Sequence, residues 1–116
     1  MDSMINKQKE ICSRFNVNWV ESSLLSKVGI AENVKLGIMP IHGLRHHPKD
    51  DSTGWYIWAG DYSDSSDFFV PLHVNHLYEW CPDIIKYLGL PPGFRFLVDN
   101  KGHEDIWIDN TLLSID

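Results

Sequence analysis

The segment 55–59, Trp-Tyr-Ile-Trp-Ala, constrains the fold of this chain more than any other. Its residues are aromatic, β-branched or small, and a glycine stands on each side, so the pattern predicts a strand. Successive side chains of a strand point to opposite faces, which places Tyr56 and Trp58 on one face and the odd-numbered positions on the other. Because both faces are apolar, this strand is either buried at the centre of a sheet or presents one face to a partner.

Other strand patterns lie on both sides of this segment. An alternating stretch ends at Pro40, an apolar run ends at Pro71, and two apolar stretches near the C-terminus flank the turn 99–102 as in an antiparallel hairpin. The region 41–54 has the composition of a loop, and 19–33 gives no clear pattern beyond a short helical turn within 20–28. The predicted strands are 34–39, 55–59, 94–98 and 106–108, with the apolar run at 68–70.

Two segments have helical periodicity. Asp2 or Ser3 can cap a first helix that runs to about Phe15. A second, amphipathic helix is predicted near 72–88, where Pro82 lies on the polar side and either kinks the helix or splits it in two. The chain after 110 carries Leu112 and Leu113, which we expect to pack on the body. The apolar face of the second helix consists of Val74, Leu77, Tyr78, Cys81, Ile84, Ile85 and Leu88.

The length and composition indicate one folded domain over residues 1–116. A chain of 116 residues is typical of a single domain, and a hydrophobic fraction of 43% can fill a core without disulfides or metal. Strand and helix patterns alternate irregularly along it. We therefore expect an α+β fold with a mainly antiparallel sheet, an N-terminal helix and the helix near 72–88 packed on that sheet.

The net charge of −6 limits the kind of partner. Nucleic-acid binding draws much of its affinity from Lys and Arg at the phosphates, and this chain has ten basic residues against sixteen acidic ones and no basic run. We expect no nucleic-acid partner. An acidic surface is better suited to a basic protein, which it would attract during diffusional encounter.

The expected compartment is the cytoplasm. Cys12 and Cys81 show neither CxxC spacing nor a disulfide-rich pattern, which is typical of reduced thiols. The first fifteen residues carry several charges and no apolar run, so we expect no signal peptide. No stretch approaches the ~18 consecutive apolar residues that a membrane span needs.

The histidines suggest a metal site but do not specify one. His46 and His47 are adjacent, and His73 and His76 are three residues apart. A zinc site needs three or four converging ligands, and neither HExxH nor paired CxxC is present. Solvated or hydrogen-bonded histidines are the favoured interpretation, and we expect no cofactor. The sequence leaves open whether the two pairs meet in space.

Two other constellations resemble functional motifs only in composition. The acidic loop 61–67 lacks the glycine and terminal glutamate of a calcium-binding EF-hand loop. His103, Glu104 and Asp105, together with Arg45 and His46, contain the groups of an acid–base site. However, the triplet follows Gly102 in a predicted turn, where charged residues are common, and no G-x-S-x-G nucleophile motif occurs.

A patch of aromatic and acidic residues is the better candidate. On a helix over 72–88, four residues spaced four, three and four apart form a stripe beside or opposite the apolar face. Tryptophan and tyrosine are enriched at binding hot spots, although large aromatic residues also pack in cores. We predict a partner-binding surface that joins this stripe to the acidic loop. Its residues are Asp61, Tyr62, Asp64 and Asp67 on the loop and His76, Trp80, Asp83 and Tyr87 on the stripe.

Several phrases of the sequence together resemble a known family. They are Gly-Leu-Arg-His at 43–46, Thr-Gly-Trp-Tyr-Ile-Trp-Ala-Gly-Asp at 53–61, Phe-Phe-Val-Pro-Leu-His-Val at 68–74, Tyr-Leu-Gly-Leu-Pro-Pro-Gly-Phe-Arg-Phe at 87–96 and Glu-Asp-Ile-Trp-Ile-Asp at 104–109. Their order is similar to that of the Imm33-like immunity proteins of bacterial polymorphic-toxin systems. The resemblance covers roughly residues 35–113, and the first third of the chain matches no family pattern.

The resemblance implies a cytosolic α+β protein that neutralises a cognate toxin by binding it, and it brings no catalytic residues. The leading hypothesis is therefore an immunity protein with a basic toxin as its partner and no membrane association. The alternative from another class is a small metal-dependent hydrolase that uses clustered His, Asp and Glu residues. A third is a homo-oligomeric module whose aromatic faces pair with each other.

Overall fold

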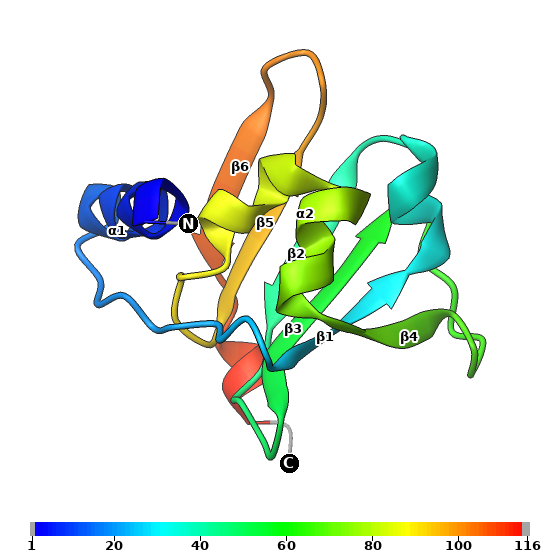
Figure 1. The fold of residues 1–116 in the computed structure, drawn as a ribbon, viewed down its shortest axis with the longest axis horizontal. Helices are drawn as coiled ribbons and strands as arrows, with labels where there is room; N and C mark the ends of the chain where they lie inside the picture. Colours follow the sequence, from blue (N-terminus) through cyan, green and yellow to red (C-terminus); the bar gives the residue numbers. More distant parts are fainter. Residues whose placement is uncertain (1, 115–116) are drawn as a thin grey trace.

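The structure is a computed structural model that describes residues 2–114, in which six strands form one sheet (Figure 1). Their order across the sheet is β4-β1-β3-β2-β5-β6. β1 and β3 run parallel, and the other neighbours are antiparallel. The strands are β1 (Lys27–Ala31), β2 (Ile41–Arg45), β3 (Ser52–Ala59), β4 (Phe69–His73), β5 (Phe94–Val98) and β6 (Glu104–Ile108).

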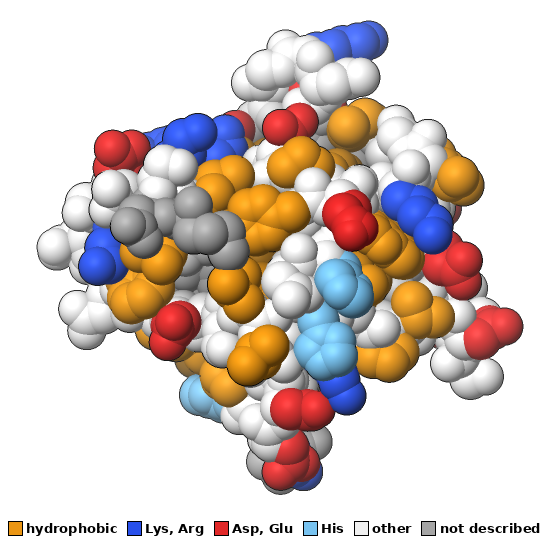
Figure 2. Space-filling view, viewed as in Figure 1, with side chains coloured by type: hydrophobic (Ala, Val, Ile, Leu, Met, Phe, Trp, Pro, Cys, Tyr) orange, Lys and Arg blue, Asp and Glu red, His pale blue; other side chains and the backbone are white. Residues whose placement is uncertain are grey.

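Short helices complete the fold, and most of them cover one face of this sheet. In Figure 1, α1, α2 and the segment that follows α2 lie on the near side of the strands. In Figure 2, which views the same side, hydrophobic side chains gather over the middle of the view, and most acidic and basic ones lie toward its rim. The predicted α+β fold with a mainly antiparallel sheet is confirmed. The helices are α1 (Asp2–Arg14), η1 (Glu32–Leu36), η2 (Val74–His76), α2 (Leu77–Trp80), η3 (Pro82–Tyr87) and η4 (Asn110–Leu113).

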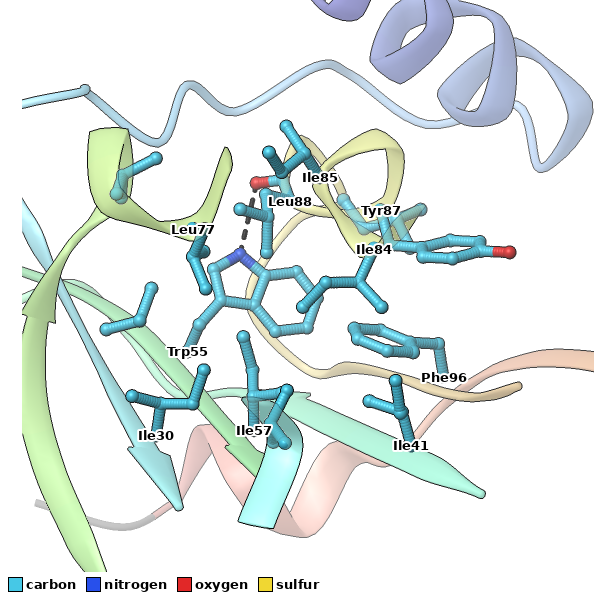
Figure 3. Close-up of a cluster of buried hydrophobic side chains, with 14 of the residues drawn as sticks. Ile30, Ile41, Trp55, Ile57, Leu77, Ile84, Ile85, Tyr87, Leu88 and Phe96 are labelled. Carbon is cyan, nitrogen blue, oxygen red and sulfur yellow. Dashed lines mark hydrogen bonds between the residues drawn. The ribbon is translucent and has the colours of Figure 1, made fainter. Parts of the chain in front are cut away.

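The core lies between the sheet and these helices (Figure 3). Trp55 is fully buried at its centre, and its indole Nε1 donates a hydrogen bond of 3.0 Å to the carbonyl oxygen of Leu88. Ile57 and Ala59 follow Trp55 on the same face and are also fully buried. The assignment of the odd-numbered positions of segment 55–59 to one shared face is therefore correct, and this face is the covered one.

A buried arginine ties the connection from α1 to β1 onto the core. Arg45 is fully buried at the end of β2 and donates hydrogen bonds to backbone carbonyls. Burial lowers the pKa of its guanidinium to about 10, which leaves it charged at neutral pH. The accepting carbonyls belong to Val20, Glu21, Thr53, Leu88 and Leu90.

The strand predicted at 34–39 is wrong, because the chain there forms η1 and an exposed turn. The side-chain amide of Asn33 makes both hydrogen bonds that a neighbouring strand would make. Its Nδ2 donates to the carbonyl oxygen of Ala59, and its Oδ1 accepts from the backbone N–H of Ala59. Pairing with β3 therefore ends at this point. Val34 enters the core, whereas Leu36 is 72% exposed, so the alternating pattern reflects one anchor residue and not a strand.

Two strands were not predicted, and both contain a glycine under an aromatic ring. β1 lies in the region without a clear pattern, and β2 lies in the region interpreted as a loop. A Cβ at Gly29 would stand 2.7 Å from a ring atom of Tyr56, and a Cβ at Gly43 would stand 2.1 Å from the ring of Phe96. Each glycine weakens the local strand pattern, but the sheet requires it because a ring from a neighbouring strand fills its space.

The helix predicted near 72–88 begins later than expected and is split into shorter pieces. Residues up to His73 belong to β4, and the remainder divides into η2, α2 and η3. The division between α2 and η3 falls at Cys81, whose φ and ψ of −163° and 81° are extended. A residue before proline is disfavoured in the helical region, and Pro82 offers no N–H to continue the helix. The second of the two outcomes considered for Pro82, a split helix, is the one observed.

The remaining predicted elements agree with the structure. The first helix ends at Arg14, one residue before the expected boundary, and β3 contains the whole predicted segment 55–59. β5 has the predicted bounds, and β6 begins two residues earlier than predicted. The C-terminal segment packs back through Leu112, which is 6% exposed, while Ile115 lies outside the described residues.

Candidate aromatic binding face

The sheet face opposite the helices carries the candidate site. Tyr56 and Trp58 point to this face from β3, and α1, α2 and η3 lie on the other side. Among the described elements, η4 and the loop after β3 border it. This settles which side of the central strand is available to a partner. Its neighbouring strands contribute His42, Leu44, Phe69, Arg95, Leu97 and Trp107 to the same face.

Aromatic rings form a connected cluster on this face. The imidazole of His42 stacks on Trp58, with ring centroids 4.8 Å apart and an angle of 9° between the planes. Phe69 of β4 lies 5.3 Å from Tyr56 and 6.1 Å from Trp58, both in edge-to-face geometry. Tyr62 covers the outer part of Trp58 at 5.4 Å. These contacts reduce the exposure of Trp58 to 6%, whereas Tyr56, Tyr62 and, on β6, Trp107 remain 36%, 60% and 39% exposed and are the large rings that a partner can reach.

A groove of about 900 Å³ runs beside this cluster. One wall is the β2–β3 connection from His46 to Ser52, and the floor includes Leu44 and Tyr56. Tyr62 and Leu113 contribute from the loop after β3 and from the C-terminal segment. An aromatic groove bordered by polar side chains is typical of a binding site.

The acidic loop lies at the edge of this groove. Its Tyr62 lines the groove and is 60% exposed, which agrees with the prediction that this side chain is accessible. Asp61, Asp64 and Asp67 are also exposed, and the loop 61–67 has no basic residue. The loop half of the predicted surface is therefore joined to the open sheet face rather than to the helical stripe.

The helical half of the predicted surface does not form as predicted. Tyr87 is 3% exposed, stacks on Phe96 at 4.7 Å and donates to Glu104 from its hydroxyl. Its placement in an exposed stripe is wrong, because the break at Cys81 and the tighter turn of η3 rotate it into the core. His76 and Asp83 are exposed.

Trp80 is half-buried and lies beneath a lysine. The Nζ of Lys35 is 4.4 Å from the centroid of its ring. Within residues 2–114, no hydrogen bond, ion pair or ring contact connects Trp80 to the acidic loop. A partner-binding role for His76, Trp80 and Asp83 remains a prediction.

The histidine pairs do not assemble a metal site within residues 2–114. His73 and His76 lie 6.0 Å apart between ring centroids. His46 instead contacts Tyr56 at 5.6 Å, and its Nδ1 lies 3.2 Å from the carbonyl oxygen of Leu112. No group of three or more His, Cys, Asp or Glu side chains in the described part is arranged to hold a metal ion. The hydrolase alternative therefore has no candidate metal centre there.

The acid–base triplet is occupied by structural contacts. Glu104 accepts hydrogen bonds from Tyr87 and Arg14, and these bonds lower the pKa of its carboxyl group. His103 pairs with Asp105 at 2.8 Å on the exposed side of β6. Arg45 is buried on the helix side of the sheet and bonded to carbonyls. The triplet and Arg45 are thus held in separate places.

Charged groups surround the groove unevenly. Asp51 pairs with Lys27 at 3.0 Å, which lowers the pKa of its carboxyl group. Asp50 next to it has no ion-pair partner among the described residues.

On the other side of the face, burial against Trp58 lowers the pKa of His42, and the positive charge of Arg95 acts in the same direction.

Comparison with protein families supports the resemblance in the sequence. The family model of the Imm33-like domain matches residues 7–109, which includes every strand of the sheet. The chain belongs to the Imm33-like family. The match also includes most of the N-terminal third, where the sequence contains none of the phrases that carry the resemblance. The Imm33-like domain thus extends from α1 to the end of β6. Comparisons with curated proteins and with solved structures give no match.

Two residues of the candidate site were missed from the sequence. Phe69 was interpreted as part of a buried apolar run, and His42 as part of a loop. Both lie on the open face, because His42 pairs with Trp58 across β2 and β3 and the ring of Phe69 contacts Tyr56. Alternation of His42, Leu44 and His46 was the available signal for β2.

None of the helices within residues 2–114 is long and apolar enough to cross a membrane.

Proposed function

We propose that this Imm33-like protein is an immunity protein that neutralises a cognate toxin by binding it directly. Membership of the Imm33-like family supports the class. The observation that carries the proposal is the uncovered sheet face, where Tyr56 and Tyr62 present exposed aromatic surface beside a groove of about 900 Å³. Exposed aromatic rings next to polar side chains are the usual anchors of protein interfaces.

The charge of the protein favours a basic toxin. The net charge is −6, and the loop at the groove edge contributes Asp61, Asp64 and Asp67 without a basic residue. A basic partner would be attracted during encounter, and the aromatic rings would then set the lifetime of the complex. The cytoplasm is the proposed compartment, since a toxin must be neutralised where it would act on the producing cell.

The open face and the acidic loop form the proposed contact surface. Trp80, with His76 and Asp83, forms a second candidate surface on the helix side, but Lys35 already covers the ring of Trp80. We therefore place the principal contact at Tyr56, Tyr62 and the loop. The surface with Trp80 would contribute only to a partner that reaches around the edge of the sheet.

The test uses the product of the neighbouring open reading frame. Expressed alone it should arrest growth, and co-expression of this chain should restore growth. Calorimetry with the purified pair should give one-to-one binding. A tenfold higher salt concentration should slow association, because long-range attraction between charged surfaces is screened. A growth-arresting neighbour that neither binds the chain nor is inhibited by it would contradict the proposal.

A further inference from the structure

Tyr56 is held as a fixed platform in the groove of the open face. Its ring lies directly over Gly29, where a Cβ would stand 2.7 Å from Cδ1 and 2.8 Å from Cε1. His46 and Phe69 stand nearly perpendicular to it, with centroids 5.6 and 5.3 Å away. The backbone of β1 therefore supports one side of the ring. The side chain is still 36% exposed and lines the groove.

The chemistry of this platform favours a cation. The face of an aromatic ring is electron-rich and attracts ammonium and guanidinium groups. Two carboxylates, Asp50 and Asp51, and one lysine, Lys49, line the same groove. Asp51 is already paired with Lys27, whereas Asp50 has no ion-pair partner within residues 2–114. A ligand that combines a flat positive group with hydrogen-bond donors would satisfy both the ring and this carboxylate.

Building on the proposed function, we infer that the groove receives an arginine side chain of the partner. The guanidinium stacks on Tyr56, and the carboxylate of Asp50 accepts its hydrogen bonds. Arginine suits this site better than lysine, because its planar group stacks on a ring while its N–H groups remain directed at a carboxylate. This inference identifies the group on the basic partner that the aromatic face recognises.

The binding test uses three capped peptides that differ at one position. The central residue of Ser-Gly-X-Gly-Ser is arginine, its neutral isostere citrulline, or leucine. Each peptide is titrated into the full chain and followed by ¹H–¹⁵N NMR. The arginine peptide should give saturable shifts in β3 and in the segment 46–52. The citrulline and leucine peptides should bind at least about fivefold more weakly, in line with a cation–π contact of about 1 kcal/mol.

Three variants locate the interaction. Tyr56→Leu should abolish the preference for arginine, whereas Tyr56→Phe should retain it, because the ring face remains. Asp50→Asn should weaken the arginine peptide about threefold, as expected for a partly exposed charge pair. Asp50 has a φ of 54°, a conformation that asparagine also adopts, so this variant keeps the turn. Unchanged thermal midpoints of the variants would show that the fold is intact.

Equal binding of the arginine and citrulline peptides would overturn the inference, as would the absence of saturable shifts or shifts confined to another surface. The toxin provides an independent readout. If Tyr56→Leu binds the toxin as tightly as the wild type, the arginine site is wrong and the immunity function stands. If the wild-type chain does not bind the toxin at all, the proposed function fails whatever the peptides show.

Discussion

Arg45 Nη1 lies 2.8 Å from the carbonyl oxygen of Leu90, which joins the end of β2 to the segment after η3. The same guanidinium reaches the carbonyls of Val20 and Glu21 in the connection between α1 and β1. No carboxylate pairs with Arg45 among the described residues, so backbone carbonyls and the ring of Trp55, 5.7 Å from the guanidinium carbon, compensate its buried charge. The arginine thus holds three distant segments together on the covered side of the sheet.

Replacing Arg45 should therefore be costly. Arg45→Met should lower the free energy of unfolding by about 3–5 kcal/mol, because several buried carbonyls lose their donor. Arg14→Met is the matched control, since Arg14 is exposed and its pair with Glu104 should contribute at most about 1 kcal/mol. Urea unfolding at pH 7 measures both. Similar losses in the two variants would contradict the role of Arg45.

The support of Tyr56 by Gly29 can be tested by a double-mutant cycle. Gly29→Ala should destabilise the protein by about 1–3 kcal/mol, because the added methyl group displaces the ring. In a Tyr56→Ala background the same change should have a smaller effect, since the space above residue 29 is then free. Urea unfolding of the four proteins gives the coupling energy. Additive losses would show that the ring does not rest on Gly29.

Stability should depend on pH through His42. Burial lowers its folded-state pKa below the ordinary value of about 6.5 for histidine. The unfolded chain therefore binds the proton more readily, and the free energy of unfolding falls as the pH decreases through this value. The free energy of unfolding stops falling on this account once the pH is below the folded-state pKa of His42. His42→Gln should lose less stability between pH 7 and pH 5 than the wild type, as measured by urea unfolding. Equal losses would contradict this prediction.

Regular patterns of the sequence predicted the framework of the fold. They missed the residues whose positions depend on contacts with distant segments of the chain. The central strand and the hairpin of β5 and β6 follow from local alternation and turn residues. β2 was missed because His42, Gly43 and Arg45 are poor strand formers by themselves. Their places depend on Trp58, Phe96 and the carbonyls of other segments. Such pairings become visible only when the sheet is assembled.

The candidate site was predicted in part for the same reason. The acidic loop and its Tyr62 depend only on local polarity, and they lie at the surface as expected. Tyr87 required an unbroken helix to reach the surface, and the extended backbone at Cys81 removes that condition. Which face of β3 is open depends on where α1 and η3 pack. Both faces of segment 55–59 are apolar, so its own residues leave that choice open.

The two candidate surfaces make different predictions for binding of the toxin. The pair Tyr62→Ala and Asp64→Asn should weaken binding by about 2 kcal/mol or more, because it removes an exposed aromatic anchor and a charge at the groove edge. The matched pair Trp80→Ala and Asp83→Asn should change the affinity by less than about 1 kcal/mol. Calorimetry on the folded variants compares them. The reverse order would move the interface to the helix side.

The central claim is that the open aromatic face binds and neutralises a toxin. The most direct measurement is the affinity of the purified neighbouring toxin for the wild-type chain and for Tyr56→Leu, with growth rescue scored for the same two proteins. We expect tight one-to-one binding and rescue by the wild type, with both strongly reduced in the variant. Wild-type affinity and full rescue by a folded Tyr56→Leu variant would contradict it.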